Sequence, residues 1–258
     1  MSTINPYRIG LSIIYKRLLW DLNPQSWVSR KKIQSIKDIH KGEKCLILCN
    51  GPSLLKTNFE LLKKSNAFSI GLNKVNLLFD KSDFRPDYIV AVNKFVIEQN
   101  LPFFKNSKIP LFLDSYASKV GISNRENVHF LHSSNQKGEF AHDCSMSINQ
   151  GFTVTYVAIQ LAYHMGFSEV SLVGCDHNFT VKGCPNQIVT SSSQDPNHFD
   201  PNYFSGGVKW QLPDLLESEA SYIKAKREFE QAGRKIYNST IGGKLEIFTR
   251  KPLEEFLS

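Results

Sequence analysis

Short apolar runs alternate with amphipathic segments from Lys44 onward, and this pattern predicts most of the secondary structure. Buried strands are expected at Cys45–Cys49, Phe68–Leu72, Tyr88–Val92, Pro110–Leu113, Val128–Leu131, Val170–Val173 and Lys235–Tyr237. Helices are expected at Phe59–Lys64, Thr153–Met165 and Glu217–Ala232, and a glycine typical of a helix end follows each of the last two. Strands that alternate with helices predict an α/β fold with a mostly parallel sheet.

Residues 180–213 interrupt this alternation. The segment is rich in Ser, Asn, Asp, Pro and Gly, yet it contains Phe199, Tyr203, Phe204 and Trp210. Segments of this length without a regular pattern are usually functional or disordered. Because the embedded aromatic side chains favour order, we interpret residues 180–213 as an ordered lid, called the lid segment below.

Residues 1–40 form a separate N-terminal extension, and residues 41–258 form the α/β domain. Apolar residues between Ile9 and Trp20 are interleaved with Arg8, Lys16 and Arg17, which predicts a basic amphipathic helix. Such a helix lies on an anionic membrane, or it packs on the core or on a second subunit of a homo-oligomer. The sequence leaves both interpretations open.

Composition narrows the class of protein and of partner. With 258 residues, 41% hydrophobic residues and 18 Phe, the chain fits one α/β domain with a sizeable core. The net charge of +7 favours an acidic partner, either nucleotide phosphates or an anionic membrane, and no nucleic-acid-binding motif is present. No apolar run approaches the roughly 20 residues of a membrane span, and no signal-peptide pattern occurs. We therefore expect a cytoplasmic protein, peripheral at the inner face of the membrane under the first interpretation of the helix.

Three asparagines occupy equivalent positions. Asn50, Asn73 and Asn93 each follow a predicted strand, and ligands of open parallel sheets bind at the carboxyl ends of strands. An Asn side chain offers two donors and an acceptor to a base edge, a ribose or a phosphate, although Asn is also common in strand-end turns for local reasons. After Asn50, we expect Gly51 to let the backbone approach a ligand and Ser53 to cap the next helix beside an anion.

Further candidates follow in the second half of the chain. The helix that begins at Thr153 is preceded by Asn149, Gln150 and Gly151, which we expect to present amides to a phosphate. The strand that follows this helix ends at Asp176 and His177. In the lid segment, His198 is the predicted general base, and Tyr203 and Lys209 are predicted to neutralise a leaving phosphate. The five cysteines are expected to be reduced, mostly buried thiols, and no His or Cys spacing predicts a metal site.

Two stretches resemble known families. The segment from Cys49 to Leu54, CNGPSL, is similar to the opening motif of metal-independent bacterial sialyltransferases that have a single Rossmann-like domain. The segment from Ile148 to Asp176 resembles their central helix–strand–Asp unit, and it looks still more like the MptE-like family. That family includes an archaeal 6-hydroxymethylpterin diphosphokinase, flagellin-glycosylation factors and proteins of surface polysaccharide synthesis. The resemblance implies a Rossmann-like fold for residues 44 to 250.

The resemblance also implies a function. In these sialyltransferases, asparagines matching Asn50, Asn73 and Asn93 bind the CMP-sugar. We therefore expect a glycosyltransferase that requires no cofactor and moves a nucleotide-activated sugar, with a CMP-sugar favoured, to a glycan acceptor in surface glycan or lipopolysaccharide synthesis. Ser147 stands where these sialyltransferases have an Arg, so this chain departs from their site for the sialic acid carboxylate.

Two alternatives remain open. The first is an ATP-dependent diphosphokinase of the 6-hydroxymethylpterin type. This activity needs Mg²⁺, for which Asp176, Asp195 and Asp200 are the candidate ligands. The second alternative is a non-catalytic nucleotide-binding protein that kept the scaffold.

Overall fold

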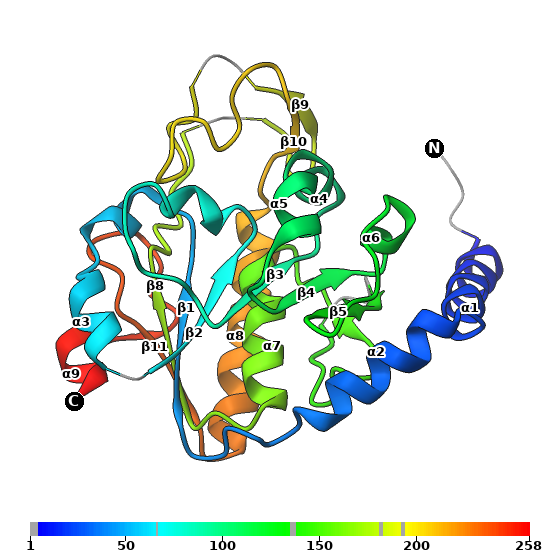
Figure 1. The fold of residues 1–258 in the computed structure, drawn as a ribbon, viewed down its shortest axis with the longest axis horizontal. Coiled ribbons are helices and arrows are strands. Elements are labelled where there is room, and N and C mark those ends of the chain that lie inside the picture. The colour runs from blue at the N-terminus through cyan, green and yellow to red at the C-terminus, as the bar shows by residue number, and fades with distance from the viewer. Residues whose placement is uncertain (1–4, 66, 135–137, 181–182, 192–193) are drawn as a thin grey trace.

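An eight-stranded, all-parallel sheet forms the centre of the computed structural model, which describes residues 5–65, 67–134, 138–180, 183–191 and 194–258 (Figure 1). In spatial order, the strands are β12 (Thr249–Arg250), β11 (Lys235–Asn238), β8 (Glu169–Val173), β1 (Lys44–Leu48), β2 (Phe68–Leu72), β3 (Tyr88–Ala91), β4 (Leu111–Asp114) and β5 (Val128–Leu131). The seven strands predicted from apolar runs are all present, with ends that differ by one residue at most. The Rossmann-like α/β fold is therefore confirmed.

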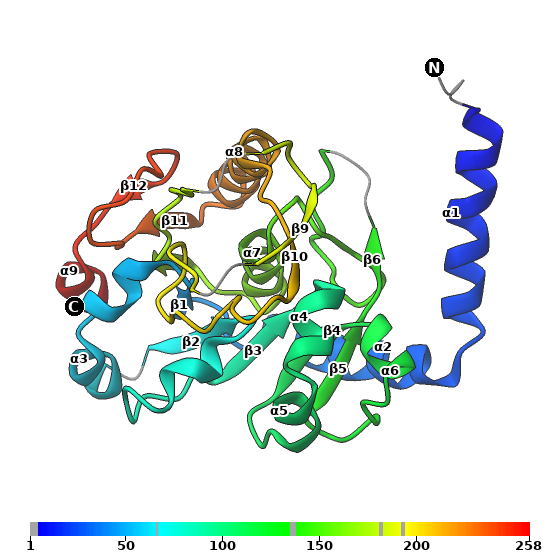
Figure 2. The ribbon, with the colours of Figure 1, turned by 90° about the horizontal axis from the view of Figure 1, so that it is seen from above.

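Continuous apolar runs form these strands because both faces of the sheet are buried. In β1, Cys45 and Ile47 join the core on one face, while Leu46 and Leu48 join the core on the other. The first face is covered by α2 (Pro24–Ser35), α7 (Val154–His164) and α8 (Leu215–Gln231). The second is covered by η1 (Pro52–Lys56), α3 (Phe59–Lys64), η2 (Val75–Leu78), α4 (Lys94–Gln99), α5 (Leu101–Asn106), α6 (Tyr116–Lys119) and α9 (Leu253–Leu257) (Figure 2).

The strand order changes direction beside β1. From β1 the chain adds β2, β3, β4 and β5 on one side, and it then returns to place β8, β11 and β12 on the other. The loops that leave β1 and β8 therefore diverge at their carboxyl ends, which is the position where ligands bind in open α/β sheets. A small parallel ladder of β6 (Ser133–Ser134) and β7 (Ile148–Asn149) leads the chain into α7 beside this point.

The lid segment crosses the carboxyl edge of the sheet (Figure 1). It contains a hairpin of β9 (Ile188–Thr190) and β10 (Lys209–Gln211), regular structure that the composition did not predict. Phe199, Tyr203 and Trp210 are buried in the second core, so the described part is ordered as expected. Residues 181–182 and 192–193 of the segment lie outside the described ranges.

Three contacts fasten the lid segment to the sheet edge. The amide N–H of Phe199 donates to the carbonyl of Asn50 over 2.9 Å. Lys81 forms an ion pair of 2.7 Å with Asp200. The buried Lys74 ammonium donates to the carbonyl of Tyr203 over 2.6 Å and lies 5.4 Å from the centre of the Tyr203 ring.

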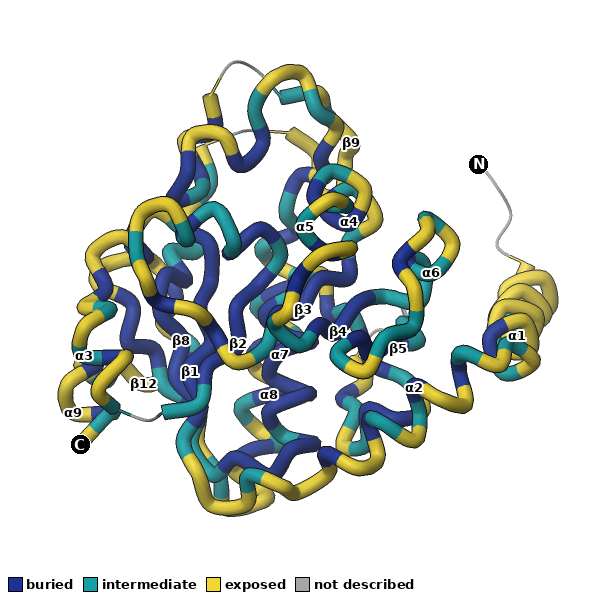
Figure 3. Tube along the Cα trace, viewed as in Figure 1, coloured by how far each residue is buried: buried dark blue, intermediate teal, exposed yellow. Residues whose placement is uncertain are grey.

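The N-terminal extension forms two helices with different surroundings. Helix α1 (Pro6–Asp21), capped by the Asn5 side chain, projects from the body, and most of its surface is exposed (Figures 2 and 3). Trp20 is the one buried residue of α1. The interpretation that this helix packs on the core of its own chain is therefore wrong for most of its length. Helix α2 instead contacts the edge strand β5 and buries Ser29 and Ile33. Among the described residues, no helix is long and apolar enough to cross a membrane.

Candidate functional site

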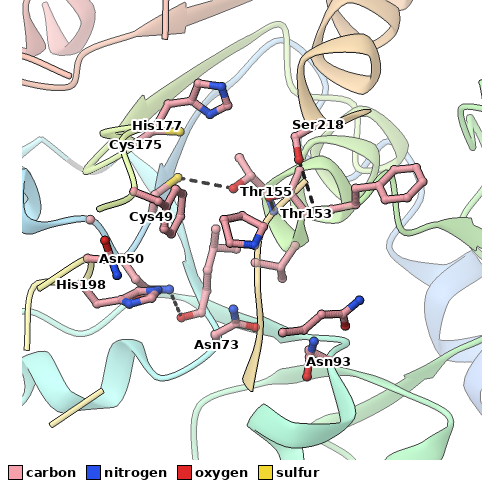
Figure 4. Close-up of a pocket in the computed structure, with 18 of the residues that line it drawn as sticks. Cys49, Asn50, Asn73, Asn93, Thr153, Thr155, Cys175, His177, His198 and Ser218 are labelled. Carbon is pink, nitrogen blue, oxygen red and sulfur yellow. Dashed lines mark hydrogen bonds between the residues drawn. The ribbon is translucent and has the colours of Figure 1, made fainter. Parts of the chain in front are cut away.

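A pocket of about 400 Å³ opens where the strand order changes direction, beneath the lid segment (Figure 4). The ends of β1, β2, β3 and β8, the start of α7, the lid segment and α8 all contribute to its wall. The fold thus gathers most of the predicted site residues, namely Asn50, Gly51, Asn73, Asn93, Asn149, Gln150, Gly151, Asp176, His177, His198 and Tyr203. Ser53 and Lys209 do not line the pocket.

Three buried amide atoms in the pocket wall have no hydrogen-bond partner among the described residues. The Asn50 side-chain N–H₂ donates to the carbonyl of Leu72 over 3.0 Å, but its Oδ1 atom is buried without a hydrogen-bond partner among the described residues. The same holds for Oδ1 of Asn73 and for Nδ2 of Asn197 in the lid segment. In contrast, Oδ1 of Asn93 accepts from the Phe95 N–H, as in an ordinary helix cap. Because buried polar groups are nearly always paired, the three unpaired atoms favour a polar ligand.

Gly51 and Ser53 act on Asp176. Both the amide and the hydroxyl of Ser53 donate to Oδ2 of Asp176, over 3.0 and 2.7 Å. A Cβ atom on Gly51 would lie 2.0 Å from that same oxygen. The prediction that Ser53 caps a helix beside a bound anion is therefore wrong: Gly51 is the cap position of η1, and the anion that Ser53 meets is the Asp176 carboxylate of the protein itself.

The start of α7 is held by a side chain that the sequence did not single out. Gln160 is fully buried; its Oε1 accepts from the Asn149 N–H over 3.0 Å, and its Nε2 donates to the Asn149 carbonyl over 2.7 Å. Gly151 has a φ of +52°, and a Cβ atom there would lie 2.2 Å from the Tyr156 ring. Thr153 then caps α7, so the positive end of the helix dipole faces the pocket.

Strained backbone concentrates at this site. Among the described residues, five other than glycine have a positive φ, and four of them line the pocket: Asn73, Phe152, His177 and Asn186. A positive φ is least expected for Phe152, because bulky side chains rarely adopt it. Such conformations persist only where surrounding contacts enforce them, and they cluster at ligand sites.

His198 has the surroundings of an oriented base. Its Nδ1 atom lies 2.7 Å from Oδ2 of the buried Asp195, and a carboxylate accepts, so Nδ1–H donates. The His198 ring is stacked on Tyr203 with a centroid distance of 3.9 Å and an interplanar angle of 1°. These contacts fix the ring and leave Nε2 as the basic nitrogen, without a hydrogen-bond partner in the described part of the chain.

The predicted phosphate-binding residues of the lid segment have different positions. Burial raises the pKa of Tyr203 well above its ordinary value of 10, opposed by hydrogen bonds from Lys74 and Asn73, so its hydroxyl keeps its proton. The Lys209 side chain is exposed on β10, and a role for it inside the pocket is therefore not supported by its position. Of the described residues, no lysine or arginine lines the pocket.

Sequence reasoning missed the contribution of α8. Ser218 and Tyr222 line the pocket, and the Tyr222 hydroxyl lies 3.5 Å from Oγ1 of Thr153. Both belong to the buried stripe of α8 together with Ala225 and Phe229. A serine and a tyrosine on an otherwise apolar stripe were the available signal. Asn186 and Asn197 gave no signal, because asparagine is common throughout the lid segment.

Comparison with known proteins agrees with this architecture. The family model described as 6-hydroxymethylpterin diphosphokinase MptE-like matches residues 22–182. The structure of the MAf glycosyltransferase from Magnetospirillum magneticum AMB-1 aligns with a TM-score of 0.50 and 16% identity over 89% of this chain. This chain spans 39% of that protein, and at such identity the likeness concerns the fold alone. No curated protein sequence matches. The match over residues 22–182, together with the fold and the strand-end pocket, shows that the chain belongs to the MptE-like family.

Proposed function

We propose that this protein is a glycosyltransferase that uses a nucleotide-activated sugar, with a CMP-linked sugar favoured. The observation that carries the proposal is an amide-lined pocket, without lysine or arginine in its described lining, that faces an Asp-oriented histidine. The unpaired oxygens of Asn50 and Asn73 suit the N–H and O–H donors of a base or a ribose. The fold shared with the MAf glycosyltransferase is consistent with this class of reaction.

The absence of lysine and arginine from the described lining favours CMP. A CMP-sugar carries a single phosphate, whereas UDP-sugars and ATP carry two and three. One negative charge is met by the N-terminus of α7 together with hydroxyl groups such as that of Thr153. Several phosphates in a partly buried pocket would call for cationic side chains or a metal ion.

The proposed reaction uses His198 as the general base. An acceptor hydroxyl attacks the anomeric carbon of the donor, its proton passes to Nε2 of His198, and the bond from that carbon to the phosphate oxygen breaks. Asp195 stabilises the imidazolium that forms, because its carboxylate lies 2.7 Å from Nδ1. Tyr203 holds the His198 ring by stacking, and its protonated hydroxyl accepts from the Lys74 amide N–H over 3.5 Å.

The family description also raises ATP-dependent diphosphate transfer, which requires Mg²⁺. The three candidate carboxylates do not fit a shared metal site, because Asp176 binds Ser53, Asp195 binds His198 and Asp200 binds Lys81. In the described ranges, no group of three His, Cys, Asp or Glu side chains is close enough to hold a metal ion. We therefore favour the glycosyltransferase.

Titration calorimetry with CMP, UMP, GMP and ATP, with and without Mg²⁺, tests the proposal. We expect CMP to bind without Mg²⁺ and Asn50→Ala to weaken that binding roughly tenfold, the effect of about one lost hydrogen bond. Asn106→Ala, which changes an exposed asparagine outside the pocket, is the matched control. Binding of ATP alone would overturn the proposal in favour of the diphosphokinase.

A second measurement separates an enzyme from a binding protein. The His198→Ala variant should still bind CMP, yet it should no longer transfer sugar from a CMP-linked donor to a glycan acceptor. Surface glycan or lipopolysaccharide fragments are the acceptors to test. CMP binding by the unmodified protein without turnover of any activated sugar would instead indicate a non-catalytic nucleotide-binding protein.

A further inference from the structure

Helix α1 presents a wide apolar surface that no described part of the chain covers. At 100° per residue, six apolar side chains occupy an arc of about 140° on the outward side of the helix, interrupted by Arg8. We call this arc the outer face of α1; it consists of Tyr7, Leu11, Ile14, Tyr15, Leu18 and Leu19, all exposed. Leu11 is 66% exposed and Tyr7 is 81% exposed, although both belong to a regular, capped helix.

The opposite side of α1 is fastened to the body near its C-terminal end. Trp20 is buried and stacks with His132, with ring centroids 6.2 Å apart. The Arg17 guanidinium donates to the Met146 carbonyl over 2.7 Å and to the Ser147 hydroxyl over 2.9 Å. These contacts lie at one end of α1; the rest of the helix stands away from the sheet (Figure 2), and most of its residues are exposed (Figure 3).

Charge identifies what covers the outer face. Residues 1–40 contain seven Lys or Arg residues and two acidic residues, Asp21 and Asp38, so they carry +5 of the chain's net charge of +7. Asp21 forms ion pairs with Arg17 and Arg30. The Lys32 ammonium donates to backbone carbonyls such as that of Arg125. Three further cations, Arg8, Lys16 and Lys31, are exposed and form no ion pair within the described ranges.

We propose that the outer face of α1 binds a membrane surface that contains anionic phospholipids. Buried apolar area and attraction to anionic headgroups are the two contributions that hold an interfacial helix. The outer face supplies the first, and Arg8 within it and Lys16 beside it supply the second. The nearby Trp27, 63% exposed at the start of α2, adds a side chain typical of the membrane–water boundary. The helix lies along the surface in this arrangement and does not cross it.

A second copy of the chain fits the outer face less well. Two extensions of charge +5 would repel each other when brought together. In addition, the outer face is wider than the narrow seam that pairs two helices in a coiled coil. The anionic surface removes the repulsion and covers the full width of the arc.

Co-sedimentation with vesicles tests the proposal. The parent protein should bind vesicles of phosphatidylcholine mixed with phosphatidylglycerol, bind pure phosphatidylcholine weakly, and dissociate as salt is added. Leu11→Glu should lower the partition coefficient roughly tenfold or more, because a buried leucine contributes at least that factor. The matched control is Leu216→Glu, which alters a leucine on α8 that is 78% exposed and should leave binding unchanged.

Charge is tested separately from apolar burial. The double variant Arg8→Glu, Lys16→Glu should lose binding, while Lys105→Glu, Lys108→Glu, with the same change of net charge elsewhere, should retain it. Each variant should keep the thermal unfolding temperature of the parent protein, because these side chains are exposed. Vesicle binding that survives Leu11→Glu would overturn the proposal. So would a vesicle-free dimer, measured by light scattering, that Leu11→Glu converts to monomer, because it would assign the outer face to a second copy.

Discussion

Replacing Gly51 by alanine tests the close contact between the loops that follow β1 and β8, which meet at the Asp176 carboxylate. Gly51 has φ −70° and ψ 163°, which alanine adopts without strain, so space decides the outcome. The new Cβ atom would lie 2.0 Å from Oδ2 of Asp176 and 2.7 Å from the carbonyl oxygen of Gly174. Neither contact relaxes easily, because Ser53 fixes the first atom and the Gly51 N–H binds the second over 2.9 Å.

The cost follows from the hydrogen bonds that must give way. Moving the Asp176 carboxylate breaks its two bonds from Ser53, and bonds to a charged group contribute about 1.5–3 kcal/mol each. We expect a loss of about 3 kcal/mol in the free energy of unfolding. For a chain of this length, that lowers the midpoint of thermal unfolding by roughly 6–12 °C. CMP affinity should fall as well, because Gly51 and Asp176 both line the pocket.

Differential scanning calorimetry and CMP titration are the assays. Gly10→Ala is the matched control: Gly10 lies in α1, and a Cβ atom there would have no other atom within 4 Å, so this variant should unfold no earlier than the parent protein. A Gly51→Ala variant with unchanged unfolding temperature and CMP affinity would refute the reasoning, since it would mean that the β1 and β8 loops separate at no cost.

Three further variants test the base, the lid contact and the start of α7. Asp195→Asn should lower kcat by a factor on the order of 10³ with little change in CMP affinity, because the His198 tautomer is no longer fixed; an unchanged kcat would contradict the assigned base. Burial lowers the pKa of Lys74 from 10.5 to about 8, opposed by the Asp195 carboxylate. Between pH 8 and pH 10.5, Lys74 therefore holds its proton more often in the unfolded chain than in the folded one. The unfolding free energy should rise by roughly 3 kcal/mol as the pH increases through this window. Urea unfolding should show that this rise is absent in Lys74→Met, and an equal rise in both proteins would refute it. Gln160→Leu leaves the Asn149 and Ala141 N–H groups without their acceptor and should cost about 3 kcal/mol in urea unfolding, with weaker CMP binding; unchanged stability would contradict the role given to Gln160.

The sequence predicted the sheet accurately because both of its faces are buried. In β1, Cys45–Leu48 is an unbroken apolar run that ends near the polar residues of the next loop, so its position follows from local composition. The position of Asn50, Asn73 and Asn93 at one edge also followed, since parallel strands end at the same edge. The lid hairpin was not predicted, because β9 and β10 are each three residues long and are held by pairing across the lid segment.

What each side chain does was decided by tertiary contacts. Ser53 and Asp176 are 123 residues apart in sequence, and no local pattern could show that the serine serves the carboxylate. Tyr222 reached the pocket because α8 packs beside α7, while Lys209 remained outside because β10 turns its side chain to solvent. The sequence by itself therefore determined the fold and the edge that carries the site, which depend on short-range patterns of burial. Only the tertiary structure decided which side chains come into contact at this edge, because these contacts depend on how segments distant in the sequence pack.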